Sequence, residues 1–141
     1  MIFLDSSVWI AAILSERGGS AEVIRQIINK KFQIISSLDV FEEVTRNLNQ
    51  KYPHKVQSFL VLFNSLHPIL VQPDKRTILQ ARKLINMFDA PILAATMRSK
   101  CEFLITLDRK HFMLPEISTA TGIKILSPGD YLNNYLKLEI L

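Results

Sequence analysis

The sequence contains a single cysteine, Cys101, so no disulfide can form within the chain. A lone thiol without a disulfide is typical of a reducing compartment, which predicts a cytoplasmic protein. Because Cys101 stands just before an apolar run, we expect it to be a small buried side chain and not a nucleophile.

Histidine and glycine are also scarce. The three histidines, His54, His67 and His111, are scattered without the spacing of zinc ligands. We therefore expect no zinc site, and we expect these histidines at the surface or at strand edges. Two of the four glycines lie in ERGGSAE (residues 16–22), which lacks the lysine and the spacing of a P-loop. We interpret this segment as a turn with Ser20 as the N-cap of the next helix, although GGS before a helix also suits a bound phosphate.

A long apolar run at the N-terminus is missing as well. The stretch MIFLDSSVWIAAIL is shorter than the roughly 20 residues that span a bilayer, has no leading Lys or Arg, and contains Asp5. It therefore predicts neither a signal peptide nor a membrane helix. An acidic excess is absent too, since the formal net charge is +4, which permits a polyanionic partner without requiring one.

The 141 residues are 48% hydrophobic and 21% charged, without a repeat, a linker or a low-complexity tract, and predict one folded domain over residues 1–141. Short apolar runs alternate with segments of helical periodicity. This alternation predicts an α/β fold with a parallel sheet covered by helices on both faces. Strands are expected at residues 1–5, 32–36, 67–73, 102–108 and 123–128, and helices at 6–16, 20–31, 38–52, 55–66, 75–86, 90–100 and 129–141.

Acidic residues recur where this topology places the carboxyl ends of the strands. Asp5 and Asp108 each end a strand, and Asp89 opens the helix that leads into the Asp108 strand. Glu42 and Glu43 lie early in the helix that follows the second strand. Because a helix before a parallel strand runs antiparallel to it, we expect all of these acids at one edge of the sheet.

Clustered carboxylates repel one another and raise each other's pKa, a cost that a hard divalent cation with oxygen ligands offsets. The pattern therefore favours Mg²⁺ or Mn²⁺. Taken singly, each acid has a simpler interpretation: Asp89 as an N-cap, Asp108 as a turn former, Asp5 as a cap for the helix at Val8. Convergence of all of them on one edge favours the metal site.

The segments FLDSSVWIA, IISSLDVFEEV, DAPILAA and FLITLDRKHF, in this order, resemble a PIN domain from Ile2 to about Pro128. The resemblance implies a three-layer α/β/α fold with a doubly wound five-stranded parallel sheet in the order 3-2-1-4-5. It implies a Mg²⁺- or Mn²⁺-dependent ribonuclease, and many small members are VapC-type toxins of type II toxin–antitoxin pairs. Such toxins are often dimers held inactive by a small antitoxin.

The resemblance also assigns residues. The metal-binding and catalytic acids are Asp5, Glu43, Asp89 and Asp108, with Glu42 as the alternative to Glu43. Ser6 and Thr106 are the hydroxyl neighbours that orient the carboxylates. Pro91 stands where members usually have another residue, which a first helical turn tolerates. Asp39 is an extra acid that we interpret as a helix cap.

Arg46, Arg109 and Lys110 lie near the acids and are candidates for RNA binding, with a solvated surface as the alternative. The last segment, YLNNYLKLEIL, is either a packed terminal helix or an edge for dimerisation, with Tyr131 and Tyr135 one turn apart; the leucines beside them are Leu132, Leu136 and Leu138.

Four other functions compete with the toxin ribonuclease. A receiver-like phospho-acceptor needs an acid pair after the first strand, and a haloacid-dehalogenase-type site needs an aspartate where Ser7 stands. A non-catalytic RNA-binding or scaffolding module would be expected to lack one of the acids. A solitary PIN nuclease in RNA processing, without an antitoxin, stays open as an alternative to the toxin.

Overall fold

The structure, a computed structural model, describes residues 1–136. Its core is a five-stranded, wholly parallel sheet in the order β3-β2-β1-β4-β5, which confirms the predicted α/β fold and strand order. The strands are short because only the apolar centre of each predicted run pairs with a neighbour. They are β1 (Ile2–Leu4), β2 (Ile34–Ser36), β3 (Ile69–Leu70), β4 (Phe103–Ile105) and β5 (Lys124–Leu126).

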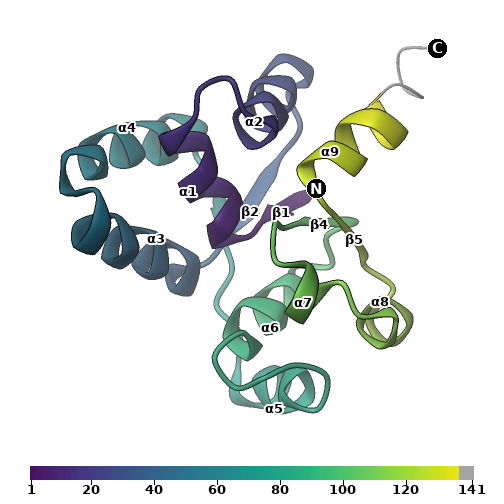
Figure 1. The fold of residues 1–141 in the computed structure, drawn as a ribbon. Helices are drawn as coiled ribbons and strands as arrows, with labels where there is room; N and C mark the ends of the chain where they lie inside the picture. Colours follow the sequence, from purple (N-terminus) through teal and green to yellow (C-terminus); the bar gives the residue numbers. More distant parts are fainter. Residues whose placement is uncertain (137–141) are drawn as a thin grey trace.

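Helices cover both faces of the sheet (Figure 1). The first four lie on one side, with α3 and α4 projecting from it, and α5, α6 and α8 lie on the other. The α-helices are α1 (Ser6–Leu14), α2 (Gly19–Lys30), α3 (Leu38–Lys51), α4 (Val56–Leu66), α5 (Lys75–Arg82), α6 (Ala90–Ser99), α7 (Arg109–Phe112), α8 (Pro115–Thr121) and α9 (Pro128–Asp130). A 3₁₀ turn (Pro53–Lys55) precedes α4, and a π-helical segment (Tyr131–Leu136) follows α9.

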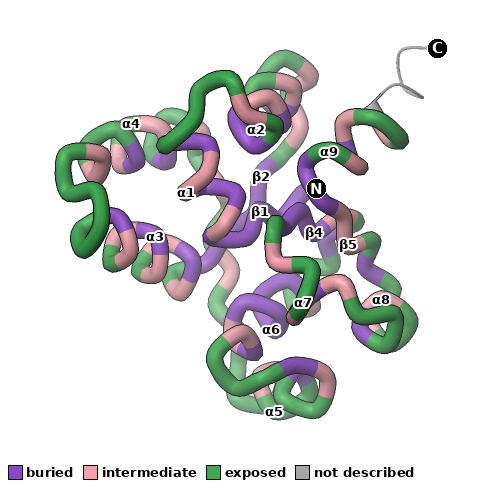
Figure 2. The backbone as a smooth tube through the Cα atoms, viewed as in Figure 1, coloured by how far each residue is buried: buried purple, intermediate pink, exposed green. Residues whose placement is uncertain are grey.

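The core lies between the sheet and the inner faces of the helices, as the buried stretches in Figure 2 show. Strand β1 is buried along its whole length because it has a paired strand on each side and helices on both faces. Trp9 from α1 packs against Phe59 and Phe63 from α4, and Phe41 from α3 contacts the same two rings. This aromatic cluster attaches the α3–α4 pair to the rest of the fold.

Two of the predicted helix caps are wrong, and one is confirmed. Gly18, not Ser20, is the N-cap of α2, which begins one residue earlier than predicted. Asp5 is the N-cap of α1, because the helix starts directly after the strand without a loop, but its side chain makes no capping bond to the helix. Ser37, not Asp39, caps α3, since its extended backbone lets its hydroxyl accept from the Val40 amide at 3.2 Å.

Some boundaries also differ from the predictions. The edge strand β3 covers only part of residues 67–73, α5 ends at Arg82 and not at residue 86, and α7 and α8 were not predicted. Cys101 is buried, as predicted. No helix within residues 1–136 is long and apolar enough to cross a membrane.

At the C-terminal end, Tyr131 and Tyr135 pack edge-on against Phe103 of β4, with ring centroids 5.5 and 5.2 Å apart. Both tyrosines thus contact their own chain, as a packed terminal segment requires. Leu138, which was placed with them, lies outside the described residues.

Candidate functional site

The carboxyl edge of the sheet holds the predicted acids. Asp5 directly follows β1, and Asp108 lies three residues beyond the end of β4. Asp89 precedes the first residue of α6, and Glu43 lies in α3, which follows β2. Four separate elements therefore contribute one carboxylate each, as the parallel topology predicts.

Asp5 is almost fully buried, with 5% of its surface exposed. Its Oδ2 accepts two hydrogen bonds of 2.8 Å, one from Thr106 Oγ1 and one from Ser7 Oγ. Ser7 Oγ in turn accepts from the Leu107 amide at 3.1 Å, and Thr106 Oγ1 accepts from the Asp108 amide at 3.0 Å. These bonds join the ends of the two adjacent strands and fix the Asp5 carboxylate between them.

Burial raises the pKa of Asp5 above its usual value, and the nearby charge of Asp89 raises it further. The hydrogen bonds from Ser7 and Thr106 act in the opposite direction, because they stabilise the charged form. Burial is the largest of these effects, so the site holds a carboxylate that costs free energy to ionise without a compensating cation.

Glu43 is connected to the same place through α1. Ser6 Oγ donates to Glu43 Oε2 at 3.0 Å, across 37 positions of sequence. Partial burial raises the pKa of Glu43, and the charges of Asp5 and Asp89 add to this, while Arg46 lowers it. Glu42 is exposed. The helical phase in the folded protein therefore turns Glu43, and not Glu42, towards the other acids.

A turn before α6 positions Asp89. Asn86 Nδ2 donates to Asp89 Oδ2 at 2.6 Å, and Asn86 Oδ1 accepts from the amides of Phe88 and Asp89. Asp89 is the N-cap of α6, but its side chain makes no capping bond to the helix. Its carboxylate is held by Asn86, half-buried at the edge of the sheet.

Asp108 is accompanied by a histidine. Asp108 Oδ1 accepts from the His111 amide at 3.1 Å, which caps α7, and Asp108 Oδ2 lies 3.0 Å from His111 Nδ1. The same ring nitrogen lies 3.9 Å from Asp89 Oδ2. Ligand atoms of Asp89, Asp108 and His111 all lie within 4.8 Å of one another, close enough to hold one metal ion.

Within residues 1–136, Asp5 and Glu43 do not join that group of three at the same spacing. The structure thus brings the acids together as two neighbouring pairs, Asp5 with Glu43 and Asp89 with Asp108, linked by the charge of Asp89. The possible ligands are mostly carboxylate oxygens, and one of the carboxylates, Asp5, is largely buried with a raised pKa. Such a set of donors fits a hard divalent cation.

Sequence reasoning missed three neighbours of these acids: Ser7, Asn86 and His111. A signal for two of them was present, because Asn86 stands three residues before Asp89 and His111 three after Asp108, the spacing of a single turn. Nothing in the sequence pointed to Ser7, whose partner amide is 100 residues away.

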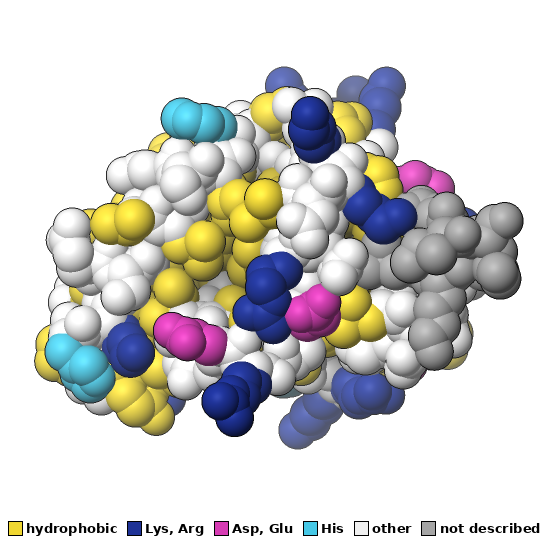
Figure 3. Space-filling view, turned by 90° about the horizontal axis from the view of Figure 1, so that it is seen from above, with side chains coloured by type: hydrophobic (Ala, Val, Ile, Leu, Met, Phe, Trp, Pro, Cys, Tyr) yellow, Lys and Arg dark blue, Asp and Glu magenta, His cyan; other side chains and the backbone are white. Residues whose placement is uncertain are grey.

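The basic candidates surround the acids at different places. Arg46 lines a hollow with Glu43 and the exposed ring of Phe88, while Lys110 lines another with His111. Arg109 lines a third pocket, together with Leu107. On the face drawn in Figure 3, Lys and Arg side chains lie near the centre as well as at the rim, among apolar side chains.

Several solved structures resemble the fold, among them the following three. VapC20 of Mycobacterium tuberculosis, described as a toxin that cleaves the sarcin–ricin loop, has a TM-score of 0.61 and 16% identity, covering 85% of this chain and 95% of its own. VapBC2 of Rickettsia felis, bound to a promoter DNA fragment, has a TM-score of 0.66 and 17% identity, and the match covers 90% of this chain and 98% of that one. FitAcB of Neisseria gonorrhoeae has a TM-score of 0.64 and 18% identity, and the match covers 92% of this chain and 99% of that one.

These identities are too low to show more than a shared fold. No curated protein matches the sequence. The sequence itself, however, matches the PIN domain family over residues 2–116, a span that contains every acid described above. The chain therefore belongs to the PIN domain family.

Proposed function

We propose that this protein is a divalent-metal-dependent endoribonuclease that hydrolyses phosphodiester bonds of RNA in the cytoplasm. The observation that carries the proposal is the convergence of Asp5, Glu43, Asp89 and Asp108, from four elements, on one edge of the sheet. A structural role alone does not explain this arrangement, because it raises the pKa of Asp5 and Glu43 and so costs stability at neutral pH.

Asp5, Glu43, Asp89 and Asp108 would together hold Mg²⁺ or Mn²⁺. Asp89 and Asp108 already lie at ligand spacing, and Asp5 and Glu43 would bind the ion directly or through water. A bound ion of this kind activates water for attack and neutralises charge on the scissile phosphate. The hydroxyls of Ser6, Ser7 and Thr106 hold the carboxylates in place by donating to Glu43 and Asp5.

His111 is assigned a positioning role. Magnesium prefers oxygen ligands, whereas the His111 ring is already within hydrogen-bonding distance of Asp108 Oδ2, at 3.0 Å. The ring therefore restricts the rotation of the Asp108 carboxylate in the way that Asn86 restricts that of Asp89.

The RNA strand would lie across this edge of the sheet, with Arg46, Arg109 and Lys110 neutralising its phosphates. Their positions around the acids support this assignment, since Arg46 lies close enough to Glu43 to lower its pKa and Arg109 and Lys110 directly follow Asp108.

We further propose that the protein is the toxin of a type II toxin–antitoxin pair, a homodimer of one-domain chains (residues 1–141) inhibited by a small antitoxin. The shared fold of VapC20, VapBC2 and FitAcB supports this proposal. Expression of the protein in a bacterial host should stop growth, and co-expression of a small protein encoded by a neighbouring gene should restore it. This experiment tests the toxin assignment separately from the nuclease.

The nuclease is tested by incubating purified protein with single-stranded RNA in MgCl₂ or MnCl₂. Cleavage is expected with either metal and should stop in excess EDTA. Glu43→Gln should slow cleavage by more than about a hundredfold, since the loss of even an outer-shell partner costs roughly 10–100-fold at metal sites. The products are followed on a denaturing gel.

The matched control is Glu42→Gln, which neutralises the adjacent acid on the same helix and should retain wild-type activity. Cleavage that persists in EDTA would refute the metal-dependent mechanism. Equal loss in both glutamate variants would mean that the overall charge of α3, and not the Glu43 carboxylate, controls activity.

A further inference from the structure

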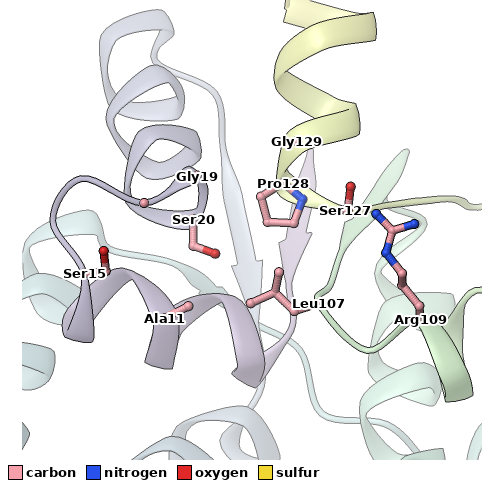
Figure 4. A pocket seen from close by; sticks show the side chains of 10 residues that line it. Ala11, Ser15, Gly19, Ser20, Leu107, Arg109, Ser127, Pro128 and Gly129 are labelled. Carbon is pink, nitrogen blue, oxygen red and sulfur yellow. The ribbon is translucent and has the colours of Figure 1, made fainter.

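The pocket that Arg109 lines is a cavity close to Asp108. Its volume is about 370 Å³, within the range of small-ligand pockets. The start of α2, the loop after β4 and the junction of β5 with α9 enclose it (Figure 4). It is lined chiefly by Gly19, Ser20, Leu107, Arg109, Ser127 and Pro128.

The pocket is next to the proposed active site. Leu107 and Arg109, two of its lining residues, flank Asp108 in sequence. The amide of Leu107 donates to Ser7 Oγ, which itself donates to Asp5. A chain bound at the acids can therefore continue into this pocket along the same edge of the sheet.

The first turn of α2 presents unused amides to the pocket. Gly18, the N-cap, supplies no side-chain hydrogen bond, and the first amide bonded back into the helix is that of Glu22, to the Gly18 carbonyl at 3.1 Å. Within residues 1–136, no hydrogen bond uses the amides of Gly19, Ser20 or Ala21. A helix start of this kind, 12 residues long in total, attracts anions.

Ser20 gives an independent indication of a ligand. Only 5% of its surface is exposed, and among the described residues its hydroxyl makes no hydrogen bond. In Figure 4 this hydroxyl points from α2 into the pocket. The hydroxyl is open to the pocket and has no partner within residues 1–136, so its proton is free to be donated to an acceptor bound there.

The remaining polar groups also favour an acceptor. Ser127 Oγ accepts from the Asp130 amide at 3.1 Å, which leaves its own proton to be donated. Arg109 is the only charged residue among the ten that line the pocket, all of them in the described part of the chain. Amide, hydroxyl and guanidinium donors around one cavity, without an acid, suit an anion.

We propose that this pocket binds a phosphate group of the RNA strand, at a position separate from the phosphate that is cleaved. The inference rests on the proposed function for the identity of the strand, while the phosphate site itself does not. The amides of α2 and the hydroxyls of Ser20 and Ser127 bind the phosphate oxygens, and Arg109 supplies the opposite charge. The site would fix the register of the strand relative to the acids.

The site is tested first with inorganic phosphate alone, in EDTA, by amide NMR of the full chain. The amide signals of Gly19 and Ser20 should shift and saturate as phosphate is added. Ser20→Ala should weaken this binding by roughly tenfold, the size expected for one hydrogen bond to a charged group. Ser58→Ala, which removes an exposed hydroxyl from α4, is the matched control and should bind as the wild type does.

The second test measures binding of a short single-stranded RNA in EDTA, prepared with and without a 5′-phosphate. Arg109→Gln should reduce the slope of log K against log salt by about 0.7, the value for one phosphate contact on a single strand. If Ser20→Ala weakens both RNAs equally, the pocket binds an internal phosphate. If it weakens binding of the 5′-phosphorylated RNA alone, the pocket binds the terminal phosphate.

The proposal is overturned if the amides of α2 do not respond to phosphate, or if Ser20→Ala binds phosphate and both RNAs as tightly as the wild type. Because no metal is present, these measurements do not depend on cleavage. Phosphate binding without any RNA cleavage in Mg²⁺ would remove the proposed nuclease and leave the pocket. RNA cleavage in Mg²⁺ without any response of the α2 amides to phosphate would keep the proposed nuclease and remove the phosphate site.

Discussion

Asp5 combines deep burial with two hydroxyl donors on a single carboxylate oxygen. The hydroxyls stabilise the charged form, but burial outweighs them and the pKa is raised. The folded protein therefore holds this proton more tightly than the unfolded chain does, whose pKa is near 3.8. The protonated Asp5 carboxyl therefore adds to the stability of the folded protein at pH values below the unfolded-state pKa. This contribution is lost as the pH rises through the folded-state pKa.

Asp5→Asn should therefore raise the melting temperature of the metal-free protein at pH 7. An asparagine carbonyl can accept the same bonds from Ser7 and Thr106 without a charge to desolvate. The gain should shrink as the pH falls, because the raised pKa lets the wild-type Asp5 carboxyl take up its proton at a higher pH than an ordinary aspartate does. Thermal unfolding in EDTA at several pH values measures this, with Glu102→Gln, an exposed acid, as the control. A variant that melts below the wild type at pH 7 would contradict it.

Short turns, more than helices, position the side chains of the candidate site. Apolar periodicity predicts that α5 continues to residue 86, but the helix ends at Arg82. The Asn86 side chain accepts from the amides of Phe88 and Asp89, which offers the backbone an alternative to a helix. The resulting turn directs Asp89 towards the other acids.

Asn86→Ala should remove this turn's side-chain bonds. We expect a loss of about 1 kcal/mol in the free energy of unfolding, and of about tenfold in RNA cleavage if the proposed function holds. Denaturant unfolding and the cleavage assay measure the two effects. Asn64→Ala, an exposed residue of α4, is the control. Unchanged cleavage in Asn86→Ala would show that Asp89 needs no support from the turn.

The cap of α3 makes a separate prediction, because this helix carries Glu43. Ser37→Ala should lower the free energy of unfolding by about 1 kcal/mol, the usual cost of losing a serine cap. Asp39→Ala should cost less, since Asp39 contributes only its charge to the first turn. Chemical denaturation of both variants compares them directly, and the opposite order would mean that Asp39 is the dominant group.

Over the whole molecule, the doubly wound sheet decides which residues meet. Its parallel strands all end at one edge, so acids 38, 46 and 19 positions apart in sequence, from Asp5 through Glu43 and Asp89 to Asp108, become neighbours. Their mutual repulsion weakens the folded state when no cation is bound. A cation that binds the folded state alone should restore that stability.

We therefore expect Mg²⁺ and Mn²⁺ to raise the melting temperature of the wild type. A ligand at a hundred times its dissociation constant stabilises by about 2.7 kcal/mol, so the shift should grow with the logarithm of metal concentration. Asp89→Asn should show a much smaller shift. NaCl at the same ionic strength separates metal binding from screening, and an equal shift with NaCl would exclude a specific site.

The sequence alone was sufficient for the α/β class, the strand order through its family resemblance, and the gathering of the acids at one edge. The fold class and the gathering of the acids follow from apolar periodicity and from the direction of parallel strands, which are local signals joined by a general rule. It was not sufficient to choose Glu43 over Glu42, to identify Gly18 and Ser37 as the caps, or to find Ser7 beside Asp5. Those depend on helix phase and on contacts between residues up to 101 positions apart, such as Thr106 with Asp5, which exist only once the sheet has formed.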